Sequence, residues 1–145
     1  MTKSQKIILF LTRISLGWLF FYAGITKVFN PEWTSAGYLN NAKTFPELFA
    51  WFAQEGNIWW VDLANQWGLT LVGVALILGI FVRYASLGGI LLMILYYIPA
   101  LTFPKVGNGF IVDDHIIYIG VFLILIAFDA GKYYGLGKHV RFLSH

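Results

Sequence analysis

The chain contains no cysteine, and only 12% of its 145 residues are charged. The absence of cysteine excludes disulfide bonds, thiol relays, cysteine-ligated metal clusters and covalent attachment of c-type haem. Histidine is also scarce, since only His115, His139 and His145 are present, and their scattered positions do not fit a metal-binding motif. The sequence therefore predicts no metal or haem site. Redox chemistry in this chain would need a bound organic molecule or a partner protein.

Hydrophobic residues make up 59% of the sequence and aromatic residues 19%, which is well outside the usual range for a soluble domain. The apolar residues form four long blocks, each close to the ~20 residues that a helix needs to cross a bilayer. These blocks cover residues 7–28, 63–82, 84–103 and 114–134. The sequence thus predicts an all-α membrane protein, a four-transmembrane-helix bundle that forms a single domain over residues 1–145.

The distribution of basic residues predicts how these spans are oriented. An even number of spans places the N-terminus, the second connection and the C-terminus on one side of the membrane. That side carries Lys3, Lys6, Arg83, Lys132, Lys138 and Arg141, whereas the opposite side is mildly acidic. The positive-inside rule then predicts a multi-pass protein of the cell membrane with both termini in the cytoplasm. This bias accounts for the net charge of +3, and no basic face predicts binding to nucleic acid.

The long outer connection over residues 30–60 contains the segment FPELFAWF, residues 45–52. Pro46 suits the first turn of a helix, and four large apolar side chains follow it with few polar neighbours. This pattern predicts a short interfacial helix. Two interpretations are open for it: a simple membrane anchor, or a lid over a site between the spanning helices.

Charged residues also lie inside the first and fourth predicted spans. At 100° per residue, Arg13 and Lys27 share one face of the first span and are separated by ~21 Å along its axis. Because the first and fourth spans run in opposite directions, Arg13 falls at the depth of Asp129, and Lys27 at the depth of His115. Charges at such depths generally pair or line a wet cavity. We therefore predict a structural ion pair between Arg13 and Asp129.

The outer ends of the spans gather a second polar cluster, which contains Lys27, Tyr96, Tyr97, Asp114, His115 and Tyr118. The helical period directs Asp113 to the opposite side of the fourth span from His115. The cluster has two interpretations. It is a functional site that combines an acid, a titratable imidazole and aromatic walls, or its members are structural. In the structural case Asp113 caps the helix, Asp114 pairs with Lys27 and His115 lies at the interface.

Several segments together resemble a known membrane protein family. The stretch RISLGWLFFYAGITK, residues 13–27, resembles the opening motif of the DoxX and DoxD proteins. The segments NPEW, WGLTLVGVALILGIFVR, FIVDDHIIY and DAGKYYGLG are similar to the DoxD-like branch, the small-subunit type of thiosulfate:quinone oxidoreductase. The resemblance implies a four-helix membrane bundle and transfer of electrons from thiosulfate to a membrane quinone. The family also includes proteins that organise redox partners, so family and catalysis are separate questions.

With a quinone as the expected cofactor, the outer cluster receives definite roles. Tyr96, Tyr97 and Tyr118 would line the slot for the ring and tail. His115 would donate to a carbonyl, and Asp114 would orient His115 or relay a proton. Lys27 would hold an anion, either a reduced quinone or thiosulfate.

Two other functions fit the same helices. A scaffold or assembly factor would use the FPELFAWF segment as a docking surface without redox turnover, and a small proton-coupled transporter would use Asp114 and His115 as a relay. The partners expected for such a chain are membrane lipid, a redox subunit on the outer side and further copies of itself.

Overall fold

The apolar blocks form long helices in the computed structural model, which describes residues 1–139. The four helices are α1 (Lys3–Val28), α4 (Glu55–Leu78), α5 (Val82–Ala100) and α6 (Asp114–Ala127). Helix α1 begins earlier than predicted because Thr2 and Gln5 form a capping box that satisfies the first free amides. Helix α4 begins at Glu55, well before the first residue of the predicted second span, 63–82. It ends where Gly79 adopts a left-handed conformation with φ 70°.

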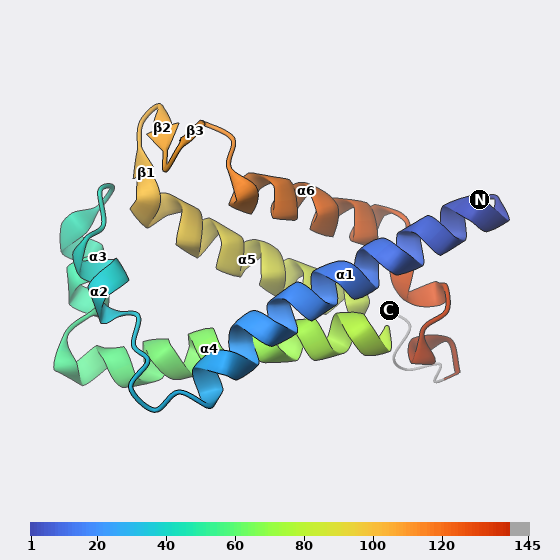
Figure 1. Cartoon of the computed structure of the whole chain (residues 1–145), viewed down its shortest axis with the longest axis horizontal. Helices are drawn as coiled ribbons and strands as arrows, with labels where there is room; N and C mark the ends of the chain where they lie inside the picture. Colours follow the sequence, from blue (N-terminus) through green and yellow to red (C-terminus); the bar gives the residue numbers. More distant parts are fainter. Residues whose placement is uncertain (140–145) are drawn as a thin grey trace.

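The helices run alternately up and down along one long axis (Figure 1). Both the N-terminus and the segment after α6 lie at the end that holds the tight α4–α5 turn. The opposite end holds α2 (Ala36–Asn40), α3 (Pro46–Phe52) and a small antiparallel sheet. The sheet, which the sequence did not predict, has the order β1-β2-β3 and consists of β1 (Leu101–Thr102), β2 (Lys105–Val106) and β3 (Gly109–Phe110).

Close helix contact explains the glycines on the predicted inner face of α1. A Cβ atom at Gly17 would lie 2.9 Å from Cβ of Leu76 in α4, and one at Gly24 would run into the backbone of Thr70. Gly73 of α4 lies equally close to the backbone of Phe21. Only glycine allows the two backbones to approach this closely. Helices α1 and α4 therefore form the most intimate pair in the bundle.

The core lies where α1, α4, α5 and α6 meet. Leu76, Phe122 and Leu125 are fully buried there. The Phe20 and Phe122 rings pack edge to face with centroids 5.1 Å apart, a favoured aromatic geometry. Phe122 covers Gly89 of α5, where any side chain would clash with its ring. The aromatic packing fixes α6 against the other three helices.

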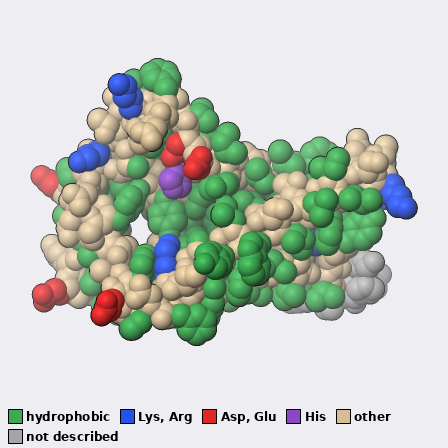
Figure 2. All heavy atoms as spheres, in the orientation of Figure 1, with side chains coloured by type: hydrophobic (Ala, Val, Ile, Leu, Met, Phe, Trp, Pro, Cys, Tyr) green, Lys and Arg blue, Asp and Glu red, His purple; other side chains and the backbone are tan. Residues whose placement is uncertain are grey.

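The surface confirms that this is a membrane protein. Large apolar side chains such as Leu11, Trp18 and Leu91 are more than half exposed along the length of the helices. Figure 2 shows the charged side chains mainly at the two ends of the molecule and around a hollow near one end. Among residues 1–139, three helices, α1, α4 and α5, are long and apolar enough to cross a membrane. Lipid is the solvent that suits such a surface.

The predicted fourth span is shorter than expected. Residues 114–134 were predicted as one helix, but α6 has 14 residues and ends at Ala127. Asp129 then adopts a left-handed conformation with φ 47°, and two short 3-10 turns follow, η1 (Ala130–Lys132) and η2 (Leu136–His139). The chain turns here because the glycines of the terminal DAGKYYGLG segment favour turns over helix.

A helix also forms at the predicted place in the outer connection, with Pro46 in its first turn. Hydrogen bonds tie the α2–α3 segment to the end of α5. The Tyr38 hydroxyl donates to the carbonyl of Tyr96, the Lys43 amide donates to Pro99 (2.8 Å) and the Thr44 hydroxyl donates to Leu101 (2.6 Å). On the other side, the Ser35 amide and hydroxyl both donate to Asp62 of α4 (2.8 and 2.6 Å). The α2–α3 segment, called the roof below, is thus fixed to α5 on one side and to α4 on the other.

Candidate functional site

Arg13 has a structural role at the end of the bundle that holds the α4–α5 turn (Figure 1). Its side chain is fully buried, and its guanidinium donates to the carbonyl oxygens of Ala130 (2.7 Å), Tyr133 (3.2 Å) and Tyr134 (3.3 Å). Asp129 instead binds Lys132 at 2.7 Å, where both side chains are more than half exposed. The predicted Arg13–Asp129 ion pair is therefore wrong. Arg13 satisfies the carbonyl groups that the turn after α6 leaves free.

Lys27 lies in a polar chamber at the opposite end, beneath the roof. Its ammonium group donates to the Asn65 side chain (3.3 Å) and to the Tyr96 hydroxyl (3.4 Å). It also lies over the rings of Trp33 (4.9 Å) and Tyr96 (5.5 Å), at distances typical of cation–π contacts. The chamber has a volume of about 350 Å³, and His115 completes its wall. Helices α1, α4, α5 and α6 each contribute a polar side chain.

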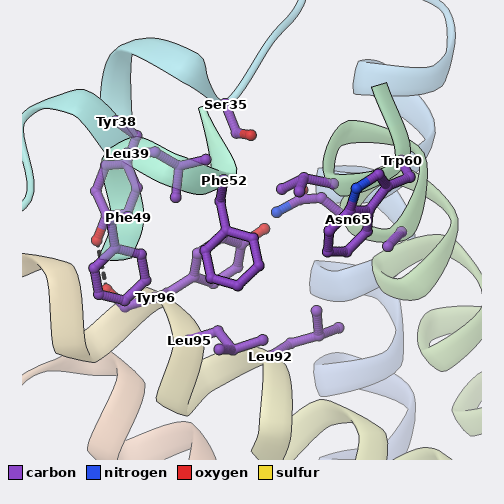
Figure 3. A pocket seen from close by; sticks show the side chains of 12 residues that line it. Ser35, Tyr38, Leu39, Phe49, Phe52, Trp60, Asn65, Leu92, Leu95 and Tyr96 are labelled. Carbon is purple, nitrogen blue, oxygen red and sulfur yellow. Dashed lines mark hydrogen bonds between the residues drawn. The ribbon is translucent and has the colours of Figure 1, made fainter. Parts of the chain in front are cut away.

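An apolar cavity of about 150 Å³ adjoins this chamber. Figure 3 shows Tyr38, Leu39, Phe49 and Phe52 of the roof facing Leu92, Leu95 and Tyr96 of α5, with Trp60 and Asn65 of α4 at the side. The cavity shares Ser35, Tyr38, Asn65 and Tyr96 with the polar chamber. The two spaces together form one site with a polar part and an apolar part, called the outer site below.

Asp113, rather than Asp114, is the partner of His115. The Asp113 carboxylate caps α6 by accepting from the backbone amides of His115 (3.0 Å) and Ile116 (3.3 Å). Its second oxygen lies 2.6 Å from Nδ1 of His115. A carboxylate at this distance favours the tautomer with the proton on Nδ1 and fixes the ring orientation. The predicted roles of the two aspartates are therefore exchanged, although capping by Asp113 was one of the two interpretations.

The outer site also contains Tyr38, which the sequence did not identify. Burial raises the pKa of Tyr38 above its ordinary value, and the nearby negative charge of Asp113 raises it further. Tyr38 therefore stays protonated and continues to donate its hydrogen bond to α5 at neutral and moderately alkaline pH.

The remaining predicted residues lie elsewhere. Tyr97 donates its hydroxyl to the carbonyl of Ile111 (2.6 Å), so it holds the strand segment next to α6. Tyr118 packs edge to face on Phe20 and lines a separate apolar groove between α1 and α6. Asp114 is exposed, and none of the hydrogen bonds among residues 1–139 joins its carboxylate to Lys27. Of the predicted residues, the outer site brings together Lys27, Tyr96 and His115.

The residues that the sequence missed come mainly from the outer connection and α4. Trp33 and Tyr38 precede the segment that was singled out, and Asn65 lies within a block predicted to be plain membrane helix. One signal was available for Asn65, because a polar amide among apolar residues of a span commonly faces a partner or a cavity. Among the described residues, no group of three histidine or acidic side chains is placed to hold a metal ion.

The fold and the outer site define a helical membrane protein with an amphipathic pocket at one end of its bundle. Residues 8–101 match the DoxX family, which covers α1 to the end of α5. The chain belongs to the DoxX family, as the motif in residues 13–27 had indicated. No curated protein and no solved structure matches the sequence.

Proposed function

We propose that this protein is the membrane subunit of a quinone-linked oxidoreductase of the thiosulfate:quinone type, and that the quinone head group binds in the outer site. The observation that carries the proposal is the junction of the polar chamber with the apolar cavity. Ligand pockets of this kind combine apolar walls with a few convergent polar groups that fix orientation. A quinone has the same division, because polar carbonyl groups are attached to an apolar ring and tail.

The residues present fit such a head group. The chamber offers the ammonium of Lys27 and the hydroxyl of Tyr96 as donors, and the imidazole of His115 lies beside Tyr96 with ring centroids 6.0 Å apart. Leu92, Leu95 and Phe52 line the apolar part and suit the ring edge or the first part of the tail. Lys27 and His115 would therefore hold the oxygen atoms of the ligand, and the roof would exclude water from its ring.

A bound quinone would accept two electrons and two protons to become a quinol, and this is the chemistry that the quinone would supply. Asp113 holds the Nδ1 proton of His115, so the other ring nitrogen is free to exchange a proton with a group in the chamber. Both side chains of the Asp113–His115 pair are partly exposed, with 17% and 29% of their area accessible. The pair thus links the chamber to water at this end of the protein. The electrons would come from thiosulfate through a partner redox subunit on the same side.

The orientation in the membrane is part of the proposal. Both ends of the described chain lie at the end of the bundle remote from the outer site (Figure 1). With both termini in the cytoplasm, the outer site faces the outside of the cell. Cysteines introduced at Asn41 and at Lys132, one at each end of this cysteine-free protein, would test the orientation with an impermeant thiol reagent on whole cells. Labelling at Lys132 but not at Asn41 would contradict it.

Quinone titration of the purified protein tests the proposed function. Trp33 and Trp60 line the outer site, so a bound quinone should quench tryptophan fluorescence. Replacement of His115 by Ala should weaken binding by about 1–3 kcal/mol if the imidazole makes a buried hydrogen bond to the ligand. The matched control is Asp114→Asn, which changes an exposed neighbour and should leave affinity unchanged. Wild-type affinity in both His115→Ala and Lys27→Met would place the site elsewhere or exclude it.

A scaffold function is the second candidate, because the roof exposes apolar side chains away from the outer site. Phe45, Leu48 and Trp51 are about half exposed or more, at 63%, 52% and 48%. A docking surface for a redox partner would use them without need for the outer site. Replacing Leu48 and Trp51 together by Ser should then release the partner while quinone affinity stays unchanged. If the partner stays bound to this variant, these side chains are not the docking surface.

A further inference from the structure

The charge of Lys27 has no carboxylate partner in the part of the chain that the structure describes. The two ion pairs found among residues 1–139 are Asp113–His115 and Asp129–Lys132. Both acceptors of the Lys27 ammonium are neutral, and both hydrogen bonds are long, at 3.3 and 3.4 Å. An ammonium group has three donors. Lys27 therefore keeps donor capacity for whatever enters the chamber, and none of these contacts neutralises its charge.

The acidic residues around the chamber do not supply the missing charge. Asp62 accepts two hydrogen bonds from Ser35 in the roof, at 2.8 and 2.6 Å. Asp113 accepts from the start of α6 and from His115. Both carboxylates are thus held by neighbours other than Lys27. A partly buried cation without a counterion attracts a negative group more strongly than an exposed one, because less water screens the charge.

The adjoining apolar cavity indicates which kind of molecule carries this negative group. A small inorganic anion would occupy only part of the chamber and leave the adjoining space between Phe52, Leu92 and Leu95 without an occupant. An amphiphile with an anionic head fills both parts. We infer that the outer site selects a ligand whose polar head carries a negative charge, and that within the quinone class it prefers a quinone with an ionised ring hydroxyl over a neutral quinone. This inference rests on the proposed function and adds the charge of the ligand to it.

Two ligands that differ in charge and by a single methyl group provide the test. A 3-alkyl-2-hydroxy-1,4-naphthoquinone is an anion at neutral pH, and its 2-methoxy ether has the same ring and tail without the charge. Both are titrated into purified protein in a neutral detergent, with tryptophan quenching as the readout. We expect the anion to bind about tenfold more tightly, the ratio that ~1.4 kcal/mol of charge attraction gives at a partly screened site.

Substitutions of Lys27 test whether its charge causes this preference. Lys27→Met keeps the length of the side chain and removes the charge, so the tenfold ratio should fall to about one. Lys27→Gln serves as the second neutral variant if the first does not fold. The matched control is Lys43→Met, which removes an exposed lysine at the same end of the molecule and should keep the ratio. A ratio that survives in both Lys27 variants would overturn the inference.

The remaining outcomes separate the inference from the proposed function. Equal affinity of wild-type protein for both ligands would overturn the charge preference and leave quinone binding intact. Failure of both ligands to bind would overturn the proposed function itself. Two competitors test the source of the anion, phosphatidylglycerol for a lipid head group and sulfate for a small ion. If either one displaces the hydroxynaphthoquinone at equal concentration, the assignment to a quinone is wrong, whereas weak competition by both supports it.

Discussion

Replacing Arg13 by Met should destabilise the protein far more than the removal of an exposed charge. The guanidinium is fully buried and makes three hydrogen bonds to carbonyl groups of the segment after α6. A hydrogen bond from a charged donor contributes roughly 1.5–3 kcal/mol, but three bonds from one group are not additive. Methionine leaves these carbonyl groups without their donor, at roughly 1–3 kcal/mol for each buried group, and we expect a total loss of about 3–5 kcal/mol.

Thermal unfolding in mild detergent measures this loss. For a chain of this size ~1 kcal/mol shifts the melting temperature by roughly 2–4 °C, so Arg13→Met should lower it by about 6–20 °C. Arg13→Lys should fall between, because one ammonium cannot reach three carbonyl groups spread over Ala130, Tyr133 and Tyr134. The control is Asp129→Asn, which breaks only an exposed pair and should cause little change.

The result that would refute this reasoning is a small shift in Arg13→Met, within about 2 °C of wild type. The three carbonyl groups would then find other donors without cost, and Arg13 would not hold the segment after α6 in place. A large shift in Asp129→Asn would instead support the Arg13–Asp129 ion pair that the sequence predicted.

Three more predictions concern the outer site and the helix contacts. Asp113→Ser keeps a helix-capping oxygen but removes the carboxylate from His115, so ¹⁵N NMR should show loss of the Nδ1–H tautomer, and an unchanged spectrum would contradict the hydrogen bond. Tyr38→Phe should cost about 1–2 kcal/mol through a carbonyl group of α5 left without its donor. Because folding raises the pKa of Tyr38, its contribution to stability is complete below the ordinary tyrosine pKa of ~10 and is lost as the pH rises above that value toward the folded-state pKa. Melts of wild type and the Phe variant should therefore differ by a constant amount at neutral pH. Gly24→Ala should lower the melting temperature, whereas Gly120→Ala, with open space around it, should not, and equal effects would contradict the glycine-dependent contact of α1 with α4.

The sequence predicted the three long apolar helices α1, α4 and α5 because their apolar blocks are long enough to cross a bilayer. The sequence could not predict where α6 ends, because the apolar pattern continues past Ala127 while the backbone turns at Asp129. The depth of Arg13 was correct, since it contacts Ala130, the residue after Asp129. The partner was wrong because the chain turns at Asp129, whose side chain binds Lys132 while the following carbonyl groups face Arg13.

The outer site was predicted in part for a similar reason. Lys27 and His115 were placed at one depth by counting residues along two helices, and the structure brings them to the same chamber. The orientation assigned to Asp113 assumed that this residue is helical, but it is the extended N-cap with φ −128° and ψ −171°. Trp33 and Tyr38 could not be predicted, because their positions depend on how the roof folds back over α4 and α5.

The shortness of α6 has a consequence for the lipid around the protein. Its 14 residues extend ~21 Å, whereas the hydrocarbon core of a bilayer is ~30 Å thick. If α6 crosses the bilayer as the fourth span, the lipid beside it would have to become thinner, whereas the lipid beside α1, with 26 residues, would keep its full thickness. A protein with one such short span would deform the bilayer on that side only. Its distribution between membranes of different thickness, and the side on which neighbouring proteins collect, should follow the position of α6.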